Sequence, residues 1–546
     1  MRKSLSKLSI FLLSCSVFGV QCQQNNITYS VITSQKSTTD MAVVVDGTTF
    51  PLQKSYGILF QGEAPVATGN YHYAVLNANQ ELITSEPFVR SPILEDTANE
   101  FFNRSSNTYN VTKLPQVLSP LSSIHRIESD LHLDNQIPTM NLWGNATAID
   151  YMNNNQLEDI DIRLNLTYFG LKDIQEFEDV KVNVAGSSSR SFDKLSYNIK
   201  IKKKKDLFGF KKLKLRSLVG DTSYVREQIC YSVIKSLGMP ASEFSYVRLF
   251  LNNEPIGLFG IIETFQDPWP ADEFSNGDKD YSSGYLYQGH IMAAENPPMQ
   301  HLSDLSYYEN LTDYSLGEYS IKAGPNRTKV EGYSALQNFT KFVHEVSNTT
   351  SESDWEEYLD NESFLRAMVA ENLLSLSDGY MTTTNNYYLY SNPLKNGQMI
   401  YIPSDMDTSL GIAIFELDLM QTGNYTQFPG LTFRPLTKKF FSYEYFSTPY
   451  QELLLNVTKE LFNPNVLNPY ITDLKNMISR DVDWDLTLPR AGKPLYSTLP
   501  TTMGSTSSYF PPGLLSNFST QGAEDVNEYI STKSSAILNF YNQTSI

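Results

Sequence analysis

The sequence predicts an α+β protein with two lobes, preceded by a small all-β domain. Short stretches that alternate apolar and polar residues fill residues 26–92, strand-like stretches dominate from about 139 to 265, and helix-like periodicity prevails beyond them. A strand-rich lobe followed by a helical lobe leaves a cleft between the two. We expect the functional residues in that cleft.

The chain begins with features typical of a secretory signal peptide over residues 1–22. Basic residues Arg2, Lys3 and Lys7 precede an apolar run from Ile10 to Val20. The run is too short to cross a bilayer, so we expect no transmembrane segment. The C-terminal residues lack the apolar tail that signals a GPI anchor, so none is expected. These features predict a secreted, extracellular protein.

Composition narrows the class of protein further. The formal net charge of -18 disfavours nucleic acid as a partner. Asn-x-Ser/Thr sequons recur along the whole chain, which favours a glycosylated surface. Only Cys230 lies beyond the predicted signal peptide, so we expect neither an internal disulfide nor a cysteine-based zinc site.

Residues 23–92 are expected to form the β-sandwich domain. Turn signals such as Asp46-Gly47 and Gly69-Asn70 separate the alternating stretches at hairpin spacing. Such a module would suit contacts with a cell surface or with carbohydrate. Residues 93–138 are rich in Asn, Ser and Pro, and are expected to form an extended linker.

Residues 139–480 are expected to form the main domain, and 481–546 a C-terminal extension of helices and loops. Ser223–Leu237 predicts the one helix of the strand-rich lobe, because its apolar residues recur every four positions and Gly238 follows. Asn252-Asn253 predicts the turn of a hairpin. Tyr333–Val346 and Ser363–Leu374 predict helices of the second lobe.

The stretch from Glu371 to Gly411 is the most chemically suggestive part of the chain. Two acids follow the apolar run Met399–Pro403. Another acid and two amides come earlier in the sequence, on the other side of a predicted hairpin. Carboxylate and amide oxygens on loops are hard ligands suited to Mg²⁺ or Mn²⁺. In phosphoryl transfer one carboxylate orients the attacking hydroxyl, while another and an amide hold the metal. The residues concerned are Asp378, Asn385, Asn386, Asp405 and Asp407.

These acids also have other interpretations. An Asp after a strand is often a turn residue that caps the backbone. An apolar strand ending in Asp-x-Asp is also a metal signature of nucleotide-sugar glycosyltransferases, but no alternating β-α pattern leads to this strand.

A basic segment runs from Lys194 to Arg216. In its strand-like parts, alternation puts the Lys and Arg side chains on one face and the apolar residues on the other. Most of these cations would simply face solvent. Lys194 is the first candidate to hold a phosphate, because it follows the small polar loop Gly186–Arg190, whose amides suit an anion.

The residues between about Gly186 and Gly411 resemble those of the CotH-type (spore coat protein H) atypical protein kinases, in particular the secreted fungal members. The resemblance rests on several short motifs that are specific together. They are Lys194–Tyr197, Leu213–Leu215 before Asp221–Arg226, Tyr246–Asn252 with Gly257 and Glu263, Asp378-Gly379, Asn386–Tyr390, and Ile402–Asp407 with Gly411.

The resemblance implies a divergent, two-lobed protein-kinase-like fold that transfers the γ-phosphate of ATP, with Mg²⁺ or Mn²⁺, to Ser/Thr of extracellular or secretory-pathway proteins. By position, Asp378 is similar to the catalytic base, and Asn386 and Asp405 to the metal ligands, with Asp407 secondary. Lys194, or Lys200 in its place, is similar to the nucleotide lysine. Arg226 and Glu263 match positions of the nucleotide cleft or its support.

The resemblance also implies a location at the cell wall or spore surface. Ser404 stands where a Trp usually precedes the acid pair of the family. With the added β domain, this substitution motivates an alternative function, a catalytically weak adhesive protein of the cell surface that keeps a kinase-like scaffold.

Overall fold

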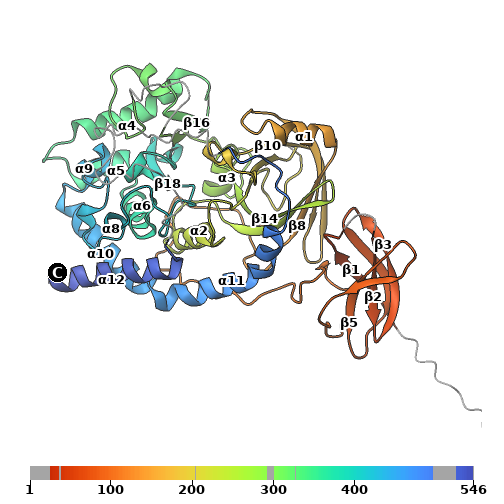
Figure 1. Ribbon diagram of the computed structural model, residues 1–546. Helices are drawn as coiled ribbons and strands as arrows, with labels where there is room; N and C mark the ends of the chain where they lie inside the picture. Colours follow the sequence, from red (N-terminus) through yellow and green to blue (C-terminus); the bar gives the residue numbers. More distant parts are fainter. Residues whose placement is uncertain are drawn as a thin grey trace, which may run out of the picture. The chain divides into compact units, whose positions relative to one another are not determined.

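The computed structural model describes residues 25–35, 39–202, 204–291, 301–325, 327–495 and 524–544. The predicted signal peptide lies outside these residues. The chain divides into two compact units, Met1–Ser105 and Ser106–Ile546 (Figure 1). The domain boundaries expected at residues 92, 138 and 480 stay predictions.

The first unit is built from strands, which confirms the predicted all-β character of the N-terminal region. β3 pairs with both β2 and β4, so the strands form one continuous sheet in the order β6-β5-β2-β3-β4-β1-β7. Alternate residues such as Tyr29, Val43 and Tyr73 meet in one core. The strands are β1 (Asn26–Ile32), β2 (Asp40–Val45), β3 (Thr48–Tyr56), β4 (Leu59–Pro65), β5 (Tyr71–Leu76), β6 (Leu82–Ser85) and β7 (Glu100–Phe101).

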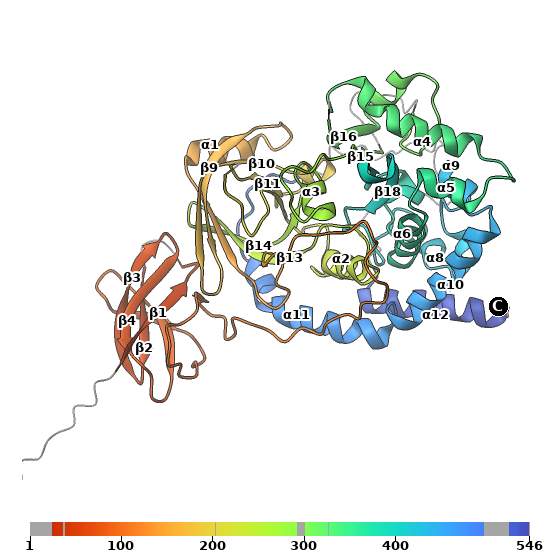
Figure 2. The same cartoon turned by 180° about the vertical axis from the view of Figure 1, so that it is seen from behind.

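The second unit begins with a closed barrel in the order β10-β11-β12-β14-β13-β8-β9. Helix α1 (Ala146–Asn154) follows the first of its strands, and α2 (Arg226–Ser236) connects β12 to β13 (Figure 2). The strands are β8 (Thr139–Trp143), β9 (Ile162–Phe169), β10 (Ile174–Val184), β11 (Tyr197–Lys200), β12 (Lys212–Arg216), β13 (Ser245–Leu251) and β14 (Glu254–Glu263).

Side chains alternate between the two faces of β12, and this alternation determines which of them lie outside the barrel core. Leu213 and Leu215 are buried in the barrel core, so Lys214 and Arg216 point to the opposite face. The hairpin of β13 and β14 turns at Asn252-Asn253, as predicted, and both residues have positive φ, at 49° and 69°. This is the conformation that a two-residue hairpin turn requires.

The second sheet has the order β16-β15-β17-β18 and is packed against helices, so the fold mixes helices and strands as predicted. Its strands are β15 (Leu286–Gly289), β16 (Tyr319–Ala323), β17 (Tyr387–Asn392) and β18 (Gln398–Pro403). The predicted helices are found as α2, α4 and α6, each within a few residues of its expected bounds. The helices around this sheet are α3 (Trp269–Phe274), α4 (Ser334–Glu345), α5 (Glu352–Tyr358), α6 (Asn361–Leu374), α7 (Tyr380–Thr383), α8 (Leu417–Met420) and α9 (Pro435–Phe440).

Helix α6 is the central helix of this region. Asp360 caps it by accepting a hydrogen bond from Ser363 N at 2.8 Å, and Ser375 ends it in the left-handed conformation. Nearly all of its residues are buried, because α2, β18 and α10 (Glu444–Glu460) all pack against it. The loop that follows α6 therefore starts from a fixed point.

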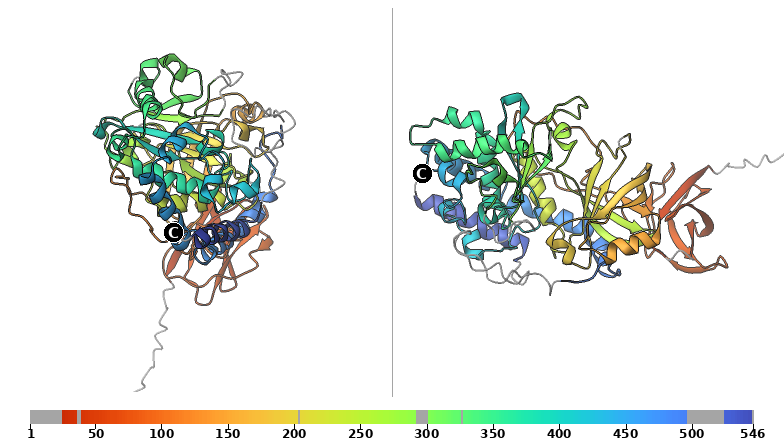
Figure 3. Two further views of the ribbon diagram at one scale, coloured as in Figure 1. Left: turned by 90° about the vertical axis from the view of Figure 1, so that its left-hand side faces the viewer. Right: turned by 90° about the horizontal axis from the view of Figure 1, so that it is seen from above.

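Long helix α11 (Pro464–Leu486) joins the helical region to the barrel and packs on β14 (Figures 1 and 3). Its last turns carry two fully buried acids. Asp481 pairs with Arg248 of β13 at 2.7 Å, and Asp485 pairs with Lys194 at 2.7 Å. Helix α12 (Val526–Thr544) packs on α10 and α11. Within the part of the chain that the structure describes, no helix is long and apolar enough to cross a membrane.

Lys533 of α12 is completely buried. Its Nζ donates to the carbonyl oxygens of Met420 at 2.9 Å and Thr422 at 3.2 Å, and it lies 5.1 Å from the centroid of the Phe428 ring. No carboxylate of the described residues pairs with it. Burial lowers the pKa of Lys533 to about 7.

This burial predicts a pH-dependent stability. Between pH about 7 and the ordinary lysine value of 10.5, the unfolded chain binds a proton that the folded protein does not, so the free energy of unfolding rises with pH across that window. Lys533→Met removes this pH dependence. We expect the variant to have a higher free energy of unfolding than wild type, and the difference, measured by urea unfolding, to be smaller at pH about 9.5 than at pH about 6. Lys475→Met, which changes a side chain that is 41% exposed, is the control. An advantage of the same size at both pH values would contradict the prediction.

Candidate active site

The hairpin of β17 and β18 brings the predicted amide and acid pair together. Tyr387 pairs with Pro403 in the register, so Asn386 and Ser404 come next to each other, and Ser404 N donates to Asn386 O at 3.0 Å. Asn386 and Asp405 both have positive φ, at 54° and 57°. A strained Asp at the end of a strand is typical of a functional turn.

Asp378 lies at the opposite side of this turn and is hydrogen-bonded to it. Asn386 Nδ2 donates to Asp378 Oδ2 at 2.9 Å and to its carbonyl oxygen at 3.1 Å. Asn385 Nδ2 and Thr383 Oγ1 also donate to the carboxylate, at 3.1 and 2.8 Å. Because the amide nitrogen of Asn386 is committed to Asp378, its oxygen remains for another partner.

Burial raises the pKa of Asp378 to about 7, against the hydrogen bond from Thr383. The charges of Asp405 and Asp407 add to the rise, so the three acids lie within electrostatic reach of one another. A carboxyl whose pKa lies near neutrality is suited to accept and release a proton.

Two buried charged residues hold the turn of α7 that follows Asp378. Glu371 of α6 accepts from Met381 N at 3.1 Å and from Tyr401 Oη at 2.6 Å. Arg434 donates to the carbonyl oxygens of Met381, at 2.9 Å, and Thr382. Glu371 thus accepts from a backbone N–H at the start of the turn, and Arg434 donates to carbonyl oxygens further along it, so both satisfy backbone groups that a short helix leaves free. The backbone next to Asp378 is therefore fixed from both ends.

Arg216 of β12 links the barrel to the acid loop, by which we mean residues 405–411. Its Nη2 lies 2.6 Å from Asp405 Oδ1 and 3.1 Å from Asp407 Oδ2, and its Nε lies 2.9 Å from Glu227 Oε2 of α2. Burial raises the pKa of Asp405, but Arg216 and Lys214 outweigh burial and hold it below its usual range. Burial and the charge of Asp405 raise the pKa of Asp407.

Lys214 completes the charged group, and the sequence analysis did not single it out. Burial and Arg216 lower the pKa of Lys214, whereas Asp405, Glu227 and Asp407 oppose the change. Among the described residues, its ammonium group makes no hydrogen bond or ion pair. The alternation of the strand was the available signal, because it puts Lys214 on the same face as Arg216.

The donor atoms fit a hard divalent cation. Asp405 and Asp407 keep side chains that are 33% and 39% exposed, and Asn386 adds an amide oxygen. No cluster of three or more His, Cys, Asp or Glu side chains forms a metal site within the described ranges. Mg²⁺ is often bound by only one or two carboxylates together with substrate phosphates, and these residues offer that kind of donor.

Lys194 and Lys200 have other partners than the acid loop. Lys194 Nζ is buried between Asp485, at 2.7 Å, and the carbonyl oxygen of Leu258, at 2.7 Å. Lys200 is exposed at the end of β11, where it pairs across the strands with Lys181 and Lys212. The nucleotide role expected for either lysine stays a prediction, but Lys214 is the lysine that faces the acid loop.

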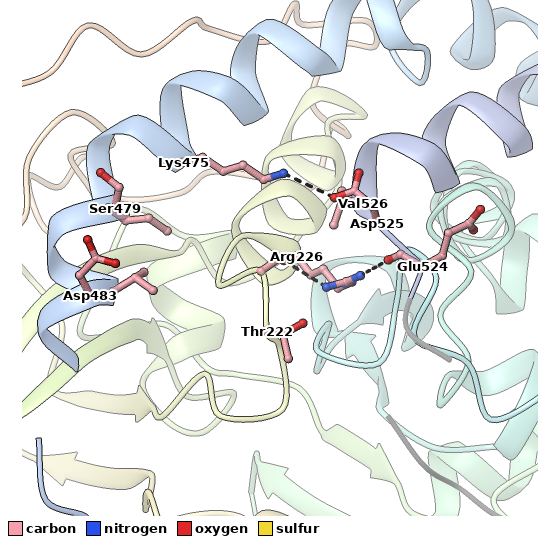
Figure 4. Close-up of a pocket in the computed structure, with 11 residues that line it drawn as sticks. Thr222, Arg226, Lys475, Ser479, Asp483, Glu524, Asp525 and Val526 are labelled. Atoms are coloured by element: carbon pink, nitrogen blue, oxygen red, sulfur yellow. Dashed lines mark hydrogen bonds and ion pairs between the residues drawn. The ribbon is translucent and has the colours of Figure 1, made fainter. Parts of the chain in front are cut away.

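Glu263 and Arg226 take supporting positions. Glu263 is buried between Arg126 and His132, and these two hold its pKa well below the usual range although burial raises it. It therefore fastens the segment before β8 to the end of β14. Arg226 pairs with Asp221 at 2.6 Å and lines a cavity beside α11 (Figure 4).

The CotH kinase protein family matches residues 182–488, which include the barrel from β11 onward and all the acids described above. The match covers more than half of the chain, so the protein belongs to this family.

Several fungal and bacterial proteins are similar to this chain. Invasin CotH2 of Rhizopus delemar is 25% identical over 98% of this chain and 88% of its own length. Invasin CotH3 of the same fungus is 26% identical over 88% of this chain and 78% of its own length. Inner spore coat protein H of Bacillus subtilis is 25% identical over 54% of this chain and 75% of its own length.

The two lysines can be separated by experiment. Lys194→Met removes the nearer of the two cations of Asp485, which keeps Arg490 at 3.5 Å, and should lower the free energy of unfolding by about 1–3 kcal/mol without changing the affinity for Mn²⁺–ATP. Lys214→Met should keep the stability and weaken Mn²⁺–ATP binding by at least about tenfold. Denaturant unfolding and calorimetric titration measure the two effects. Loss of binding in Lys194→Met with unchanged stability would reverse the assignment.

Proposed function

We propose that this protein is a metal- and ATP-dependent protein kinase that transfers the γ-phosphate of ATP to Ser/Thr hydroxyls of extracellular or secretory-pathway proteins. The observation that carries the proposal is the meeting of Asp378, Asn386 and Asp405 at one end of the β17–β18 hairpin. Their order along the chain is the order that phosphoryl transfer uses. Membership of the CotH kinase protein family supports the same function.

Each side chain has a role that follows from its position. Asp378 would accept the proton of the attacking hydroxyl, since its pKa is close to neutrality and hydrogen bonds fix its orientation. Asp405, Asn386 and Asp407 would hold Mg²⁺ or Mn²⁺, which supplies positive charge to the phosphate oxygens. Lys214 would contribute a further positive charge to the nucleotide, in place of the expected Lys194 or Lys200.

The pair of Arg216 and Glu227 supports a kinase-like arrangement. In protein kinases, a strand lysine and a helix glutamate form an ion pair at the nucleotide site. Here a strand arginine and a helix glutamate form one, and the arginine also reaches the acid loop. We take the barrel with α2 as the equivalent of the first lobe and the helical region as that of the second.

The protein would act outside the cell or in the secretory pathway. This location rests on the predicted signal peptide and the sequons, and on the names of the relatives. Proteins called invasin and inner spore coat protein suit a cell surface, cell wall or spore surface. The acceptor would then be another secreted or surface protein.

An adhesive protein of the cell surface with a catalytically weak site is the second candidate. The all-β first unit offers a separate surface for contacts with cells or carbohydrate. Ser404, which is buried, replaces the Trp usual in the family before Asp405. Under this function, cell binding would be the same in wild type and in Asp378→Asn, and neither would transfer phosphate.

Phosphate transfer from labelled ATP to a Ser-rich acceptor tests the first candidate. Asp378→Asn should bind Mn²⁺–ATP like wild type but transfer phosphate at least about 100-fold more slowly, because it lacks the base. Asp405→Asn should lose Mn²⁺–ATP binding itself. Asp418→Asn, at an exposed acid of α8, is the matched control.

The proposal fails if wild type and Asp405→Asn incorporate equal label. Preference of the wild type for a nucleotide sugar over ATP would instead indicate a glycosyltransferase.

A further inference from the structure

The first turn of α2 is connected to both ends of the acid loop. Glu227 reaches the beginning of the loop through Arg216, which contacts Asp405. Arg226, the preceding residue, donates from Nε to the carbonyl oxygen of Leu410 at 3.3 Å. Consecutive helical residues point about 100° apart, so one turn can reach both sides of the loop.

Arg226 also contacts the segment that begins α12. Its Nη2 donates to the carbonyl oxygen of Glu524 at 2.6 Å, as Figure 4 shows. Glu524 N in turn donates to Gly411 O at 3.3 Å. Gly411 has a φ of 95°, and a Cβ atom there would lie 3.0 Å from Glu524 Cβ. The chain therefore needs glycine at this close approach.

The arginine itself is held rigidly. Asp221 accepts from Arg226 Nη1 at 2.6 Å and from its backbone nitrogen at 2.9 Å, and the side chain is only 2% exposed. A planar guanidinium can donate in several fixed directions at once, which a lysine ammonium cannot reproduce. Its donors are directed to a carboxylate and to two carbonyl oxygens from different parts of the chain.

We propose that Arg226 is a positioning residue that sets the acid loop for metal–nucleotide binding, by joining α2, Leu410 and the segment beginning at Glu524. This inference rests on the proposed function. Of the two roles expected for Arg226, in the nucleotide cleft or its support, it favours the support, and it makes the segment that begins α12 a part of that support.

Arg226→Lys tests the inference, because it keeps the charge beside Asp221 but cannot bond both carbonyl oxygens. We expect the amides of residues 408–412 to exchange hydrogen faster in the protein without ligand, and the affinity for Mn²⁺ with an ATP analogue to fall about 10- to 100-fold. Lys475→Met is the matched control, since Lys475 lines the same cavity but contacts only the α12 side, 3.7 Å from Asp525. It should match wild type in both measurements.

Gly411→Ala disturbs the contact between Gly411 and Glu524 and leaves Arg226 unchanged. It should also give faster hydrogen exchange at residues 408–412 and a lower affinity for Mn²⁺ with the ATP analogue. It is informative even if Arg226→Lys does not fold. Unchanged exchange at residues 408–412, or faster exchange with unchanged Mn²⁺ affinity, would overturn the inference. If the wild-type protein binds neither Mn²⁺ nor the ATP analogue, the proposed function fails, and so does the predicted effect of Arg226 on affinity. If only the hydrogen exchange at residues 408–412 is unchanged in the variants, the inference about Arg226 fails but the proposed function does not.

Discussion

The contact on which the candidate site depends is the buried guanidinium of Arg216. It is paired with Glu227 on one side and with Asp405 and Asp407 on the other, so a strand of the barrel, helix α2 and the acid loop share one cation. Leaving a buried charge without a partner is costly, and loss of Arg216 would remove the cation that all three carboxyl groups share. The position of the acid loop is therefore tied to the register of β12 and to the first turn of α2.

The balance of charge around Arg216 favours a further cation. Three carboxyl groups, those of Glu227, Asp405 and Asp407, surround Arg216 and Lys214, and burial raises the pKa of Glu227 to about 7 and also raises that of Asp407. Asp378 lies close enough for its pKa to be raised by the same acids. A divalent cation on the exposed side of Asp405 and Asp407 would relieve the repulsion among these acids. The same acids would then serve both metal binding and proton transfer.

Much of this arrangement could be predicted from the sequence, because local signals specify it. The periodicity of residues 223–237, the apolar run before Asp405 and the turn at Asn252-Asn253 each correspond to an element of the structure. The roles of the lysines were harder to predict. Lys194 follows a small polar loop and Lys214 lies in a strand pattern, but Lys194 meets Asp485, nearly 300 residues further along the chain. No local pattern reports such a distant partner.

Long-range pairing also explains why the partners of other charged residues could not be predicted from the sequence. Arg216 and Glu227 were not singled out, because a salt bridge between a strand and the following helix has no signature beyond its residue types. Glu263 and Arg226 were expected in the nucleotide cleft or its support, and the structure pairs them with Arg126, His132 and Asp221, while a nucleotide role for either stays a prediction. Buried charges of this kind hold the scaffold, and only the complete fold distinguishes them from charges that face a ligand.

In the proposed function, the acids around Arg216 form the metal–nucleotide site. The most direct test is a crystal structure of wild-type protein with Mn²⁺ and a non-hydrolysable ATP analogue, read by the anomalous signal of manganese. The account predicts a manganese peak coordinated by Asp405 and Asn386, with Lys214 facing the phosphates and Glu227 still paired with Arg216. A peak elsewhere, or a nucleotide whose phosphates lie beside Lys194, would contradict it.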